Sequence, residues 1–185
     1  RRRLRRVRPS AARGLVIVRW GLDELPALAG ERPFVVAGPR WRELLPGAPR
    51  WEEVPSHRIE VPDGADVIVA IGGGSAIDTA KAASAASGLP LVSVPTTYSG
   101  AEWTTFFGVR DPERRMRGGG SGANLHAIVY EPELTLGLPV EATVGTALSS
   151  SRTGLRTSRR RAGACAARWF SWRAGKLGWL SVFFT

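Results

Sequence analysis

The chain has few of the residues that metal sites and disulfide frameworks require. Its 185 residues include one cysteine, Cys165, and two histidines, His57 and His126. A single cysteine cannot form an intramolecular disulfide, which is typical of a reducing compartment, so we expect a cytoplasmic location. No run approaches the roughly 18 apolar residues of a membrane span. The apolar stretch Gly14–Val18 is too short for a signal peptide, and we expect no membrane partner.

Acidic residues are absent from both ends of the chain. Residues 1–13 contain seven arginines, and residues 149–185 contain eight lysines or arginines. The part between them, residues 14–148, holds the other 11 basic residues against all 16 acidic ones, a net charge of −5, whereas the whole chain is at +10. The middle part therefore gives no reason to expect specific nucleic-acid binding. The Arg-rich ends can still bind nucleic acid or anionic lipid without specificity.

These differences divide the chain into three parts. We expect a basic, disordered N-terminus at residues 1–13, a folded domain at 14–148 and an aberrant Arg-rich tail at 149–185. The tail shows no helical or strand period that a core could use. Out-of-frame translation of a GC-rich reading frame would explain it, as would a premature truncation followed by unrelated sequence. The middle part is long enough to bury a workable core.

The most informative stretch runs from an apolar segment through small residues into a helix. Asp66–Ile71 is almost continuously apolar, which is typical of a strand covered on both faces of a parallel sheet. Four small residues then lead into an alanine-rich helix expected at Ala76–Ser87: Gly72, Gly73, Gly74 and Ser75. Glycines let a ligand approach the backbone, and the first N–H groups of a helix attract an anion. This predicts a cradle for a dinucleotide pyrophosphate; a tight turn without a ligand is the alternative.

A second strand and two hydroxyl groups follow that helix. Leu89–Val94 is predicted to be a buried strand, and Thr96 and Thr97 come just after it. Ligands of open parallel sheets bind outside the carboxyl ends of the strands, so both threonines are expected beside the glycine loop. Two other phosphate loops do not fit, because Ile77 stands where G-x-G-x-x-G needs its third glycine and no Gly-Lys-Ser/Thr follows.

Together the two motifs resemble the iron-type (group III) alcohol dehydrogenase superfamily. The chain reads Gly-Gly-Gly-Ser-x-x-Asp-x-x-Lys from Gly72 and, about 20 residues later, Val-Pro-Thr-Thr. The form Pro-Thr-Thr-Tyr-Ser-Gly-Ala-Glu-Trp-Thr, which begins at Pro95, is most similar to the maleylacetate reductase branch. The resemblance extends from near Leu15 to near Leu148.

The resemblance implies an α/β fold, with a Rossmann-like parallel sheet and flanking helices as in the N-terminal half of dehydroquinate synthase-like proteins. The helical C-terminal domain is then missing from this chain. Residues 14–148 become a dinucleotide-binding domain for NAD or NADP. Further cofactor contacts are implied for Asp78 and Thr104. For Asp78 and Lys81, three residues apart on the predicted helix, the alternative is an ordinary surface ion pair.

The choice between NAD and NADP turns on the end of an earlier strand. Arg32–Ala37 is predicted as a strand that ends at Gly38. Relatives strict for NAD often carry Asp at that point to bind the adenosine ribose. Glycine, with Arg40 nearby, leaves NADP acceptable too, so the resemblance makes Gly38 a cofactor contact; a plain turn with a solvated arginine is equally compatible.

The metal ligands of the family are not found in this chain. The family reads Gly-x-Asp/Asn-Ala-Leu-x-His at its ligand helix, whereas Ser149 and Thr153 stand here in place of the acid or amide and the histidine. Hydroxyl groups are poor ligands for Fe²⁺ or Zn²⁺. Neither His57 nor His126 matches a ligand position. We therefore predict no metal site and assign no catalytic residue.

Two further expectations concern residues 58–130. Arg58–Val61 is predicted to be a strand. The second glycine triplet, within residues 110–122, follows a charged turn and is predicted to be a flexible loop. The resemblance implies that strands near Thr104–Val109 and Ala127–Tyr130 pair over the nicotinamide end, where Arg115 or Arg117 could meet an acidic substrate or phosphate.

Three functions remain open. One is an NAD(P)-dependent oxidoreductase of the family, acting on an alcohol, aldehyde or keto acid; whether it forms a homodimer is left open. The second is a catalytically inactive dinucleotide-binding fragment, which we expect of this chain because it lacks the helical half. The third is a dehydroquinate synthase-like lyase, against which the form of the segment after Pro95 argues.

Overall fold

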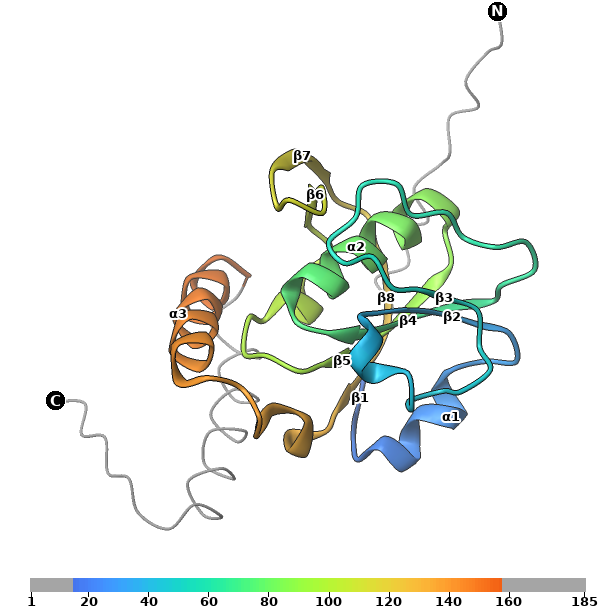
Figure 1. Cartoon of the computed structure of the whole chain (residues 1–185), viewed down its shortest axis with the longest axis horizontal. Coiled ribbons are helices and arrows are strands. Elements are labelled where there is room, and N and C mark those ends of the chain that lie inside the picture. The colour runs from blue at the N-terminus through green and yellow to red at the C-terminus, as the bar shows by residue number, and fades with distance from the viewer. Residues whose placement is uncertain (1–14, 158–185) are drawn as a thin grey trace, which may run out of the picture.

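A computed structural model describes residues 15–157, with side chains described as far as residue 148. Its centre is a six-stranded, entirely parallel sheet in the order β1-β8-β5-β4-β2-β3 (Figure 1). The strands of this sheet are β1 (Ile17–Trp20), β2 (Pro33–Ala37), β3 (Arg50–Trp51), β4 (Val67–Gly72), β5 (Pro90–Pro95) and β8 (Asn124–Tyr130). This architecture confirms the predicted α/β, Rossmann-like fold.

The central strands are buried on both faces. Every residue of β4 is buried, as the continuous apolar run predicts. Because successive side chains of a strand point to opposite faces, Val35 of β2 packs in one core cluster and Phe34 in another. The sheet therefore separates two apolar layers and must be covered on both sides.

Helices cover the two faces. The 14-residue helix α2 (Gly74–Ser87) packs on one face, and α1 (Leu25–Leu28) lies on the other (Figure 1). Ile77, Ala80 and Ala83 of α2 are buried against the sheet. The alanines let the helix approach the strands closely. Short 3₁₀ turns complete the connections: η1 (Leu22–Glu24), η2 (Pro39–Trp41), η3 (Ala101–Trp103) and η4 (Pro132–Thr135).

The prediction of a flexible loop at the second glycine triplet is wrong. Residues Met116–Gly120 form strand β7, which pairs antiparallel with β6 (Phe107–Arg110) in a separate hairpin. A Cβ atom at Gly119 would lie 2.9 Å from the carbonyl oxygen of Phe107, and one at Gly120 would lie 2.9 Å from its ring. The glycines thus permit close packing against β6 rather than flexibility.

The predicted pairing of the strands near residues 104–109 and 127–130 is also wrong. β8 lies in the main sheet between β1 and β5, and β6 pairs only with β7. Residues 127–130 are all buried, so this strand has to lie inside a covered sheet rather than in an exposed hairpin.

No strand forms at Arg58–Val61; instead Arg50–Trp51 forms the short edge strand β3. Pro55 and Pro62, which flank the predicted strand, have no N–H group for a ladder. The side chains of Ile59 and Val61 still pack against the core. Their apolar character therefore reflects burial without strand pairing.

Helix α3 (Val140–Thr157) crosses the boundary that composition predicts at residue 148. Its first part packs near Tyr98 and Tyr130 through Ala147. The predicted N-terminal segment 1–13 and residues 158–185 of the predicted tail lie outside the described residues. None of the described helices has the length and apolar character to cross a membrane.

Candidate functional site

The glycine loop joins β4 to α2 at the carboxyl edge of the sheet. Gly72 has φ +148°, and Gly73 is the N-cap of α2 without any side-chain cap. A Cβ atom would lie 2.9 Å from Ala76 Cβ if built at Gly72, and 2.8 Å from Thr97 Cγ2 if built at Gly73. At Gly74 the nearest atom would be Ser99 Oγ at 3.3 Å. The first two positions have no room for a side chain, so the backbone of the loop packs directly against Ala76 and Thr97.

The start of α2 has the character of an anion site. The N–H groups of Ala76 and Ile77 donate to the Gly73 carbonyl at 3.0 and 3.1 Å. Those of Gly74 and Ser75 come earlier in the first turn, where a helix supplies no acceptor. This is the N-terminus of a 14-residue helix, where the aligned peptide dipoles present their positive end and stabilise anions.

Both predicted threonines lie beside this loop. The Thr96 N–H donates to the Gly72 carbonyl at 3.0 Å, which fixes the end of β5 to the loop. The Thr97 hydroxyl lies close to Gly73, 3.1 Å from where a Cβ atom would stand. Among the described residues this buried hydroxyl has no hydrogen-bond partner. A buried polar atom without a partner is costly, so this hydroxyl is an unsatisfied polar group directly beside the glycine loop.

Asp78 and Lys81 are not the ordinary surface ion pair given as the alternative. The Lys81 side chain is fully buried, and its Nζ donates to Asp78 Oδ1 at 3.3 Å. It also donates to Thr104 Oγ1 at 3.2 Å, so Asp78 and Thr104 share one ammonium group. Burial lowers the pKa of Lys81, and Asp78 opposes that shift. The structure thus brings these two predicted contacts together.

Gly38 reaches the same edge from the neighbouring strand. Ala37 is in register with Ile71, so Gly38 and Gly72 end adjacent parallel strands. A Cβ atom at Gly38 would meet only Val54, at 3.7 Å. Beyond it, the guanidinium of Arg40 lies over the Trp41 ring, 4.1 Å from the centroid. The exposed Arg40 is the cation next to this strand end.

Sequence reasoning missed a buried polar chain beneath the site. Trp103 Nε1 donates to the Tyr130 hydroxyl at 2.7 Å, and that hydroxyl donates to Glu102 Oε1 at 2.9 Å. Burial raises the pKa of Glu102, against hydrogen bonds from its surroundings and the charge of Lys81. An acid followed by tryptophan inside a hydroxyl-rich segment is the signal that could have indicated it.

The two arginines proposed to meet an acidic substrate are both paired with Asp111. Arg115 Nε donates to Asp111 Oδ2 at 2.9 Å, and Arg117 Nε donates to the same oxygen at 2.8 Å. Asp111 itself is buried at the base of the β6–β7 turn. In this arrangement both arginines stabilise the hairpin.

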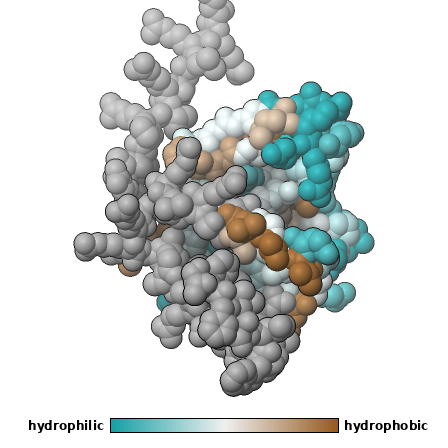
Figure 2. Space-filling model, turned by 90° about the vertical axis from the view of Figure 1, so that its left-hand side faces the viewer, coloured by the Kyte–Doolittle hydropathy of each residue, from teal (hydrophilic) through white to brown (hydrophobic). Residues whose placement is uncertain are grey.

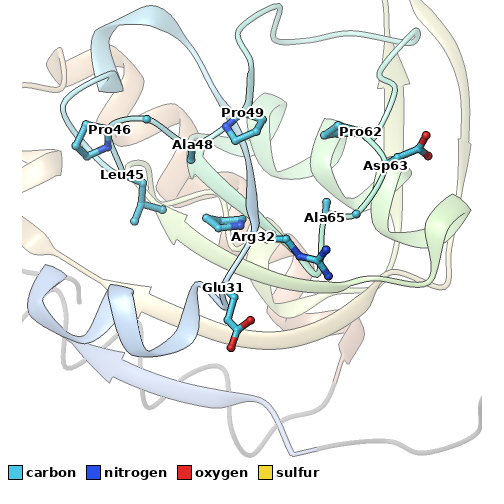
Figure 3. Close-up of a pocket in the computed structure, with 12 residues that line it drawn as sticks. Glu31, Arg32, Leu45, Pro46, Ala48, Pro49, Pro62, Asp63 and Ala65 are labelled. Atoms are coloured by element: carbon cyan, nitrogen blue, oxygen red, sulfur yellow. The ribbon is translucent and has the colours of Figure 1, made fainter.

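A separate cavity lies at the opposite edge of the sheet. Its volume is about 530 Å³, and it is lined by residues 31–33, 45–49 and 62–65 (Figure 3). β2 and β4 begin there, at Pro33 and Val67. Because the glycine loop lies at the other end of β4, the cavity does not belong to that site.

The described residues do not provide a metal centre. They contain no group of three or more His, Cys, Asp or Glu side chains arranged to hold a metal ion. Positions 149 and 153 lie on α3, as the predicted ligand helix requires, but they are serine and threonine. His57 and His126 are both exposed, and they lie in different parts of the fold. The donor set therefore does not fit Fe²⁺ or Zn²⁺.

Comparisons with known proteins agree with the motifs. The family model of iron-containing alcohol dehydrogenases matches residues 45–129. The maleylacetate reductase of Burkholderia cepacia is 46% identical over 87 residues, which are 47% of this chain and 25% of that enzyme. The maleylacetate reductase of Pseudomonas sp. strain P51 is 34% identical over 147 residues, covering 69% of this chain and 42% of that enzyme. The chain thus spans less than half the length of these curated relatives.

A solved structure has the same fold. Sulfoacetaldehyde reductase from Bifidobacterium kashiwanohense, in complex with NAD⁺, matches with a TM-score of 0.56 over 73% of this chain and 49% of that chain. Its sequence is 20% identical, so the likeness shows the fold alone. Taken with the glycine loop, the paired threonines and the sequence relatives, these findings show that the chain belongs to the iron-containing alcohol dehydrogenase family.

Proposed function

We propose that this chain binds NAD or NADP at the carboxyl edge of its sheet, as the dinucleotide-binding part of an oxidoreductase. The unpartnered Thr97 hydroxyl beside the uncapped start of α2 carries this proposal. The pyrophosphate would take the N–H groups of Gly74 and Ser75 and the hydroxyl of Thr97. A bound nicotinamide would supply the hydride chemistry.

The remaining predicted contacts indicate which end of the cofactor would lie at which part of this edge. Gly38 directly follows β2, the strand next to β4 and its glycine loop, and the adenosine ribose would lie there. No acidic side chain follows β2 directly, and Arg40 is exposed beside its end. A 2′-phosphate would therefore have a cation within this turn, so we propose that NADP is accepted as well as NAD. Asp78 and Thr104 would face the other end of the cofactor.

The names of the curated relatives point to the substrate. Both enzymes described above are maleylacetate reductases, so we propose an unsaturated keto acid as substrate of the whole protein to which this domain belongs. The described residues hold no group suited to a metal, and we assign none of them a role in hydride transfer or substrate polarisation. A domain that binds the cofactor without turnover is consistent with the same site. No observation favours the lyase alternative.

Thr97→Val, in the full chain, is the decisive variant. It removes the hydroxyl and keeps the branched shape, and no protein hydrogen bond is lost. We expect NADH and NADPH affinity, measured by calorimetric titration, to fall by about tenfold while thermal stability stays equal or rises. Gly73→Val should abolish binding, because its side chain would clash with Thr97.

Gly137→Val is the matched control, since a Cβ atom there meets nothing within 4 Å and the position lies outside the site. It should bind both dinucleotides like the unaltered chain. If the unaltered chain is folded by circular dichroism and binds neither dinucleotide, the proposal is wrong and the glycine loop is a turn without a ligand.

A further inference from the structure

Lys81 connects three separate parts of the site through one atom. Its Nζ donates to Asp78 Oδ1 on α2, to Thr104 Oγ1 after η3 and, at 2.8 Å, to the carbonyl oxygen of Phe106 just before β6. An ammonium group has three hydrogens, so these acceptors use its whole capacity. The side chain is fully buried, so water does not compete for these bonds.

Asp78 extends the connection into the hairpin. Its second oxygen, Oδ2, accepts a hydrogen bond from the Gly108 N–H of β6 at 3.2 Å. The carboxylate is thus held between Lys81 on its own helix and the backbone of the hairpin. α2 and the start of β6 are joined at two points, Phe106 and Gly108, and both depend on the Lys81–Asp78 pair.

Burial makes this arrangement sensitive to the loss of any member. A buried cation is tolerated when its hydrogen bonds are satisfied, and removing one partner of such a pair is strongly destabilising. An apolar replacement of the cation leaves Asp78 and the Phe106 carbonyl without their donor. Of the hydrogen bonds named above, the one from Gly108 to Asp78 then remains between the hairpin and α2.

We infer that Lys81 is a positioning residue that holds Asp78, Thr104 and the β6–β7 hairpin in one arrangement against α2. The relevance to cofactor binding rests on the proposed function, because Asp78 and Thr104 are proposed cofactor contacts. The attachment of the hairpin does not depend on that proposal.

The test combines hydrogen exchange and dinucleotide titration on the full chain. In Lys81→Met, which keeps the length of the apolar stem, the Gly108 amide is expected to exchange about tenfold faster, while Val69 in the centre of β4 is unchanged. NADH affinity is expected to fall by a similar factor. A general loss of stability would instead accelerate both amides alike.

Thr104→Val keeps the test decisive if Lys81→Met does not fold, because it removes one acceptor and leaves the cation in place. Its Gly108 amide should exchange faster in the same direction. Ser84→Ala is the matched control: Ser84 is also buried on α2 and also bridges elements, accepting from Asn124 and donating to the Leu89 carbonyl. It should leave Gly108 exchange unchanged.

Unchanged Gly108 exchange in the folded variants overturns the inference. If the unaltered chain binds NADH, equal NADH affinity of Lys81→Met also overturns it. If the unaltered chain binds no dinucleotide, the proposed function fails, whereas the exchange comparison still decides the role of Lys81.

Discussion

At the scale of single residues, Glu102 is a carboxyl group buried without a full set of partners. Oε1 accepts from Tyr130, but Oε2 has no hydrogen-bond partner among the described residues. Burial therefore raises the pKa of Glu102 above its usual 4.5. Below pH 4.5 the group is protonated in both folded and unfolded chains and has no effect on the balance between them. Above it, the unfolded chain releases the proton first, so the free energy of unfolding falls as pH rises towards the folded-state pKa.

Glu102→Gln is expected to remove this pH dependence. The amide stays neutral at every pH and can still accept the Tyr130 hydrogen bond. The variant should match the unaltered chain near pH 4 and become progressively more stable than it above pH 4.5, in urea unfolding followed by tryptophan fluorescence. Glu60→Gln, at an exposed position, is the control, and its free energy of unfolding should change with pH as that of the unaltered chain does. A constant difference between Glu102→Gln and the unaltered chain at all pH values would contradict the assignment.

At the scale of elements, the β6–β7 hairpin is held by a buried carboxylate. Burial of Asp111 opposes ionisation, but the Arg115 N–H and the guanidinium groups of Arg115 and Arg117 outweigh it and lower the pKa to about 2. The carboxylate therefore stabilises the hairpin above pH 3.8, its ordinary pKa, and this contribution is lost as pH falls towards 2.

Asp111→Asn should loosen the hairpin at neutral pH. Trypsin is expected to cleave after Arg115 and Arg117 several-fold faster than in the unaltered chain, because cleavage needs local opening. Glu113→Gln is the matched control: Glu113 also pairs with Arg115, at 3.3 Å, but is 65% exposed, and such pairs contribute little. With pepsin, the unaltered hairpin should lose protection between pH 4 and 2, whereas Asp111→Asn should change little over that range. Equal trypsin cleavage of Asp111→Asn and the unaltered chain would exclude this role of the carboxylate.

The elements also show what the sequence could and could not predict. The continuous apolar run before Gly72 and the alanine-rich helix after it predict β4 and α2, because local composition and long-range burial favour the same structure there. The glycines of β7 show the reverse case. Their composition favours a loop, and only the tight contact with Phe107 explains the strand. β8 also depends on distant partners, since periodicity alone does not tell which strands pair.

In the candidate site, too, some features could be predicted from the sequence and others could not. The glycine loop and the two threonines lie together as predicted, because parallel strands end at one edge of the sheet. Their binding role stays a prediction. The burial of Lys81 could not be predicted, since an acid and a lysine three residues apart on a helix are also typical of a solvated face. Its surroundings include the Phe106 carbonyl, which is 25 residues away in the sequence.

At the scale of the whole molecule, the carboxyl ends and the amino ends of the parallel strands form two different surfaces. The carboxyl ends of β2, β4 and β5 gather the glycine loop, Gly38 and the threonines. The amino ends of β2 and β4 adjoin the cavity of residues 31–33, 45–49 and 62–65. The proposed dinucleotide would therefore leave the cavity free.

Helix α3 adds an apolar stripe to the surface of the molecule. Val140, Val144 and Leu148 are spaced four residues apart, so they share one face of the helix. Their exposed fractions are 73%, 52% and 62%. Figure 2 shows hydrophobic residues gathered on the side of the molecule that carries α3. Exposed apolar side chains on one face of a helix favour association, and we expect the chain to self-associate through them.

Replacing Val140 and Val144 together by glutamine tests this expectation, because glutamine keeps the helix propensity and removes most of the apolar surface. In sedimentation velocity over a range of concentrations, the unaltered chain should show a rising average mass, and the double variant should stay closer to the monomer. Glu141→Gln, an exposed change on the same turn, should behave like the unaltered chain. If the double variant associates as strongly as the unaltered chain, another surface is responsible. The exposed Leu15 and Trp20, at the edge strand β1, would then be the next to change, since an edge strand offers unpaired backbone groups to a second copy.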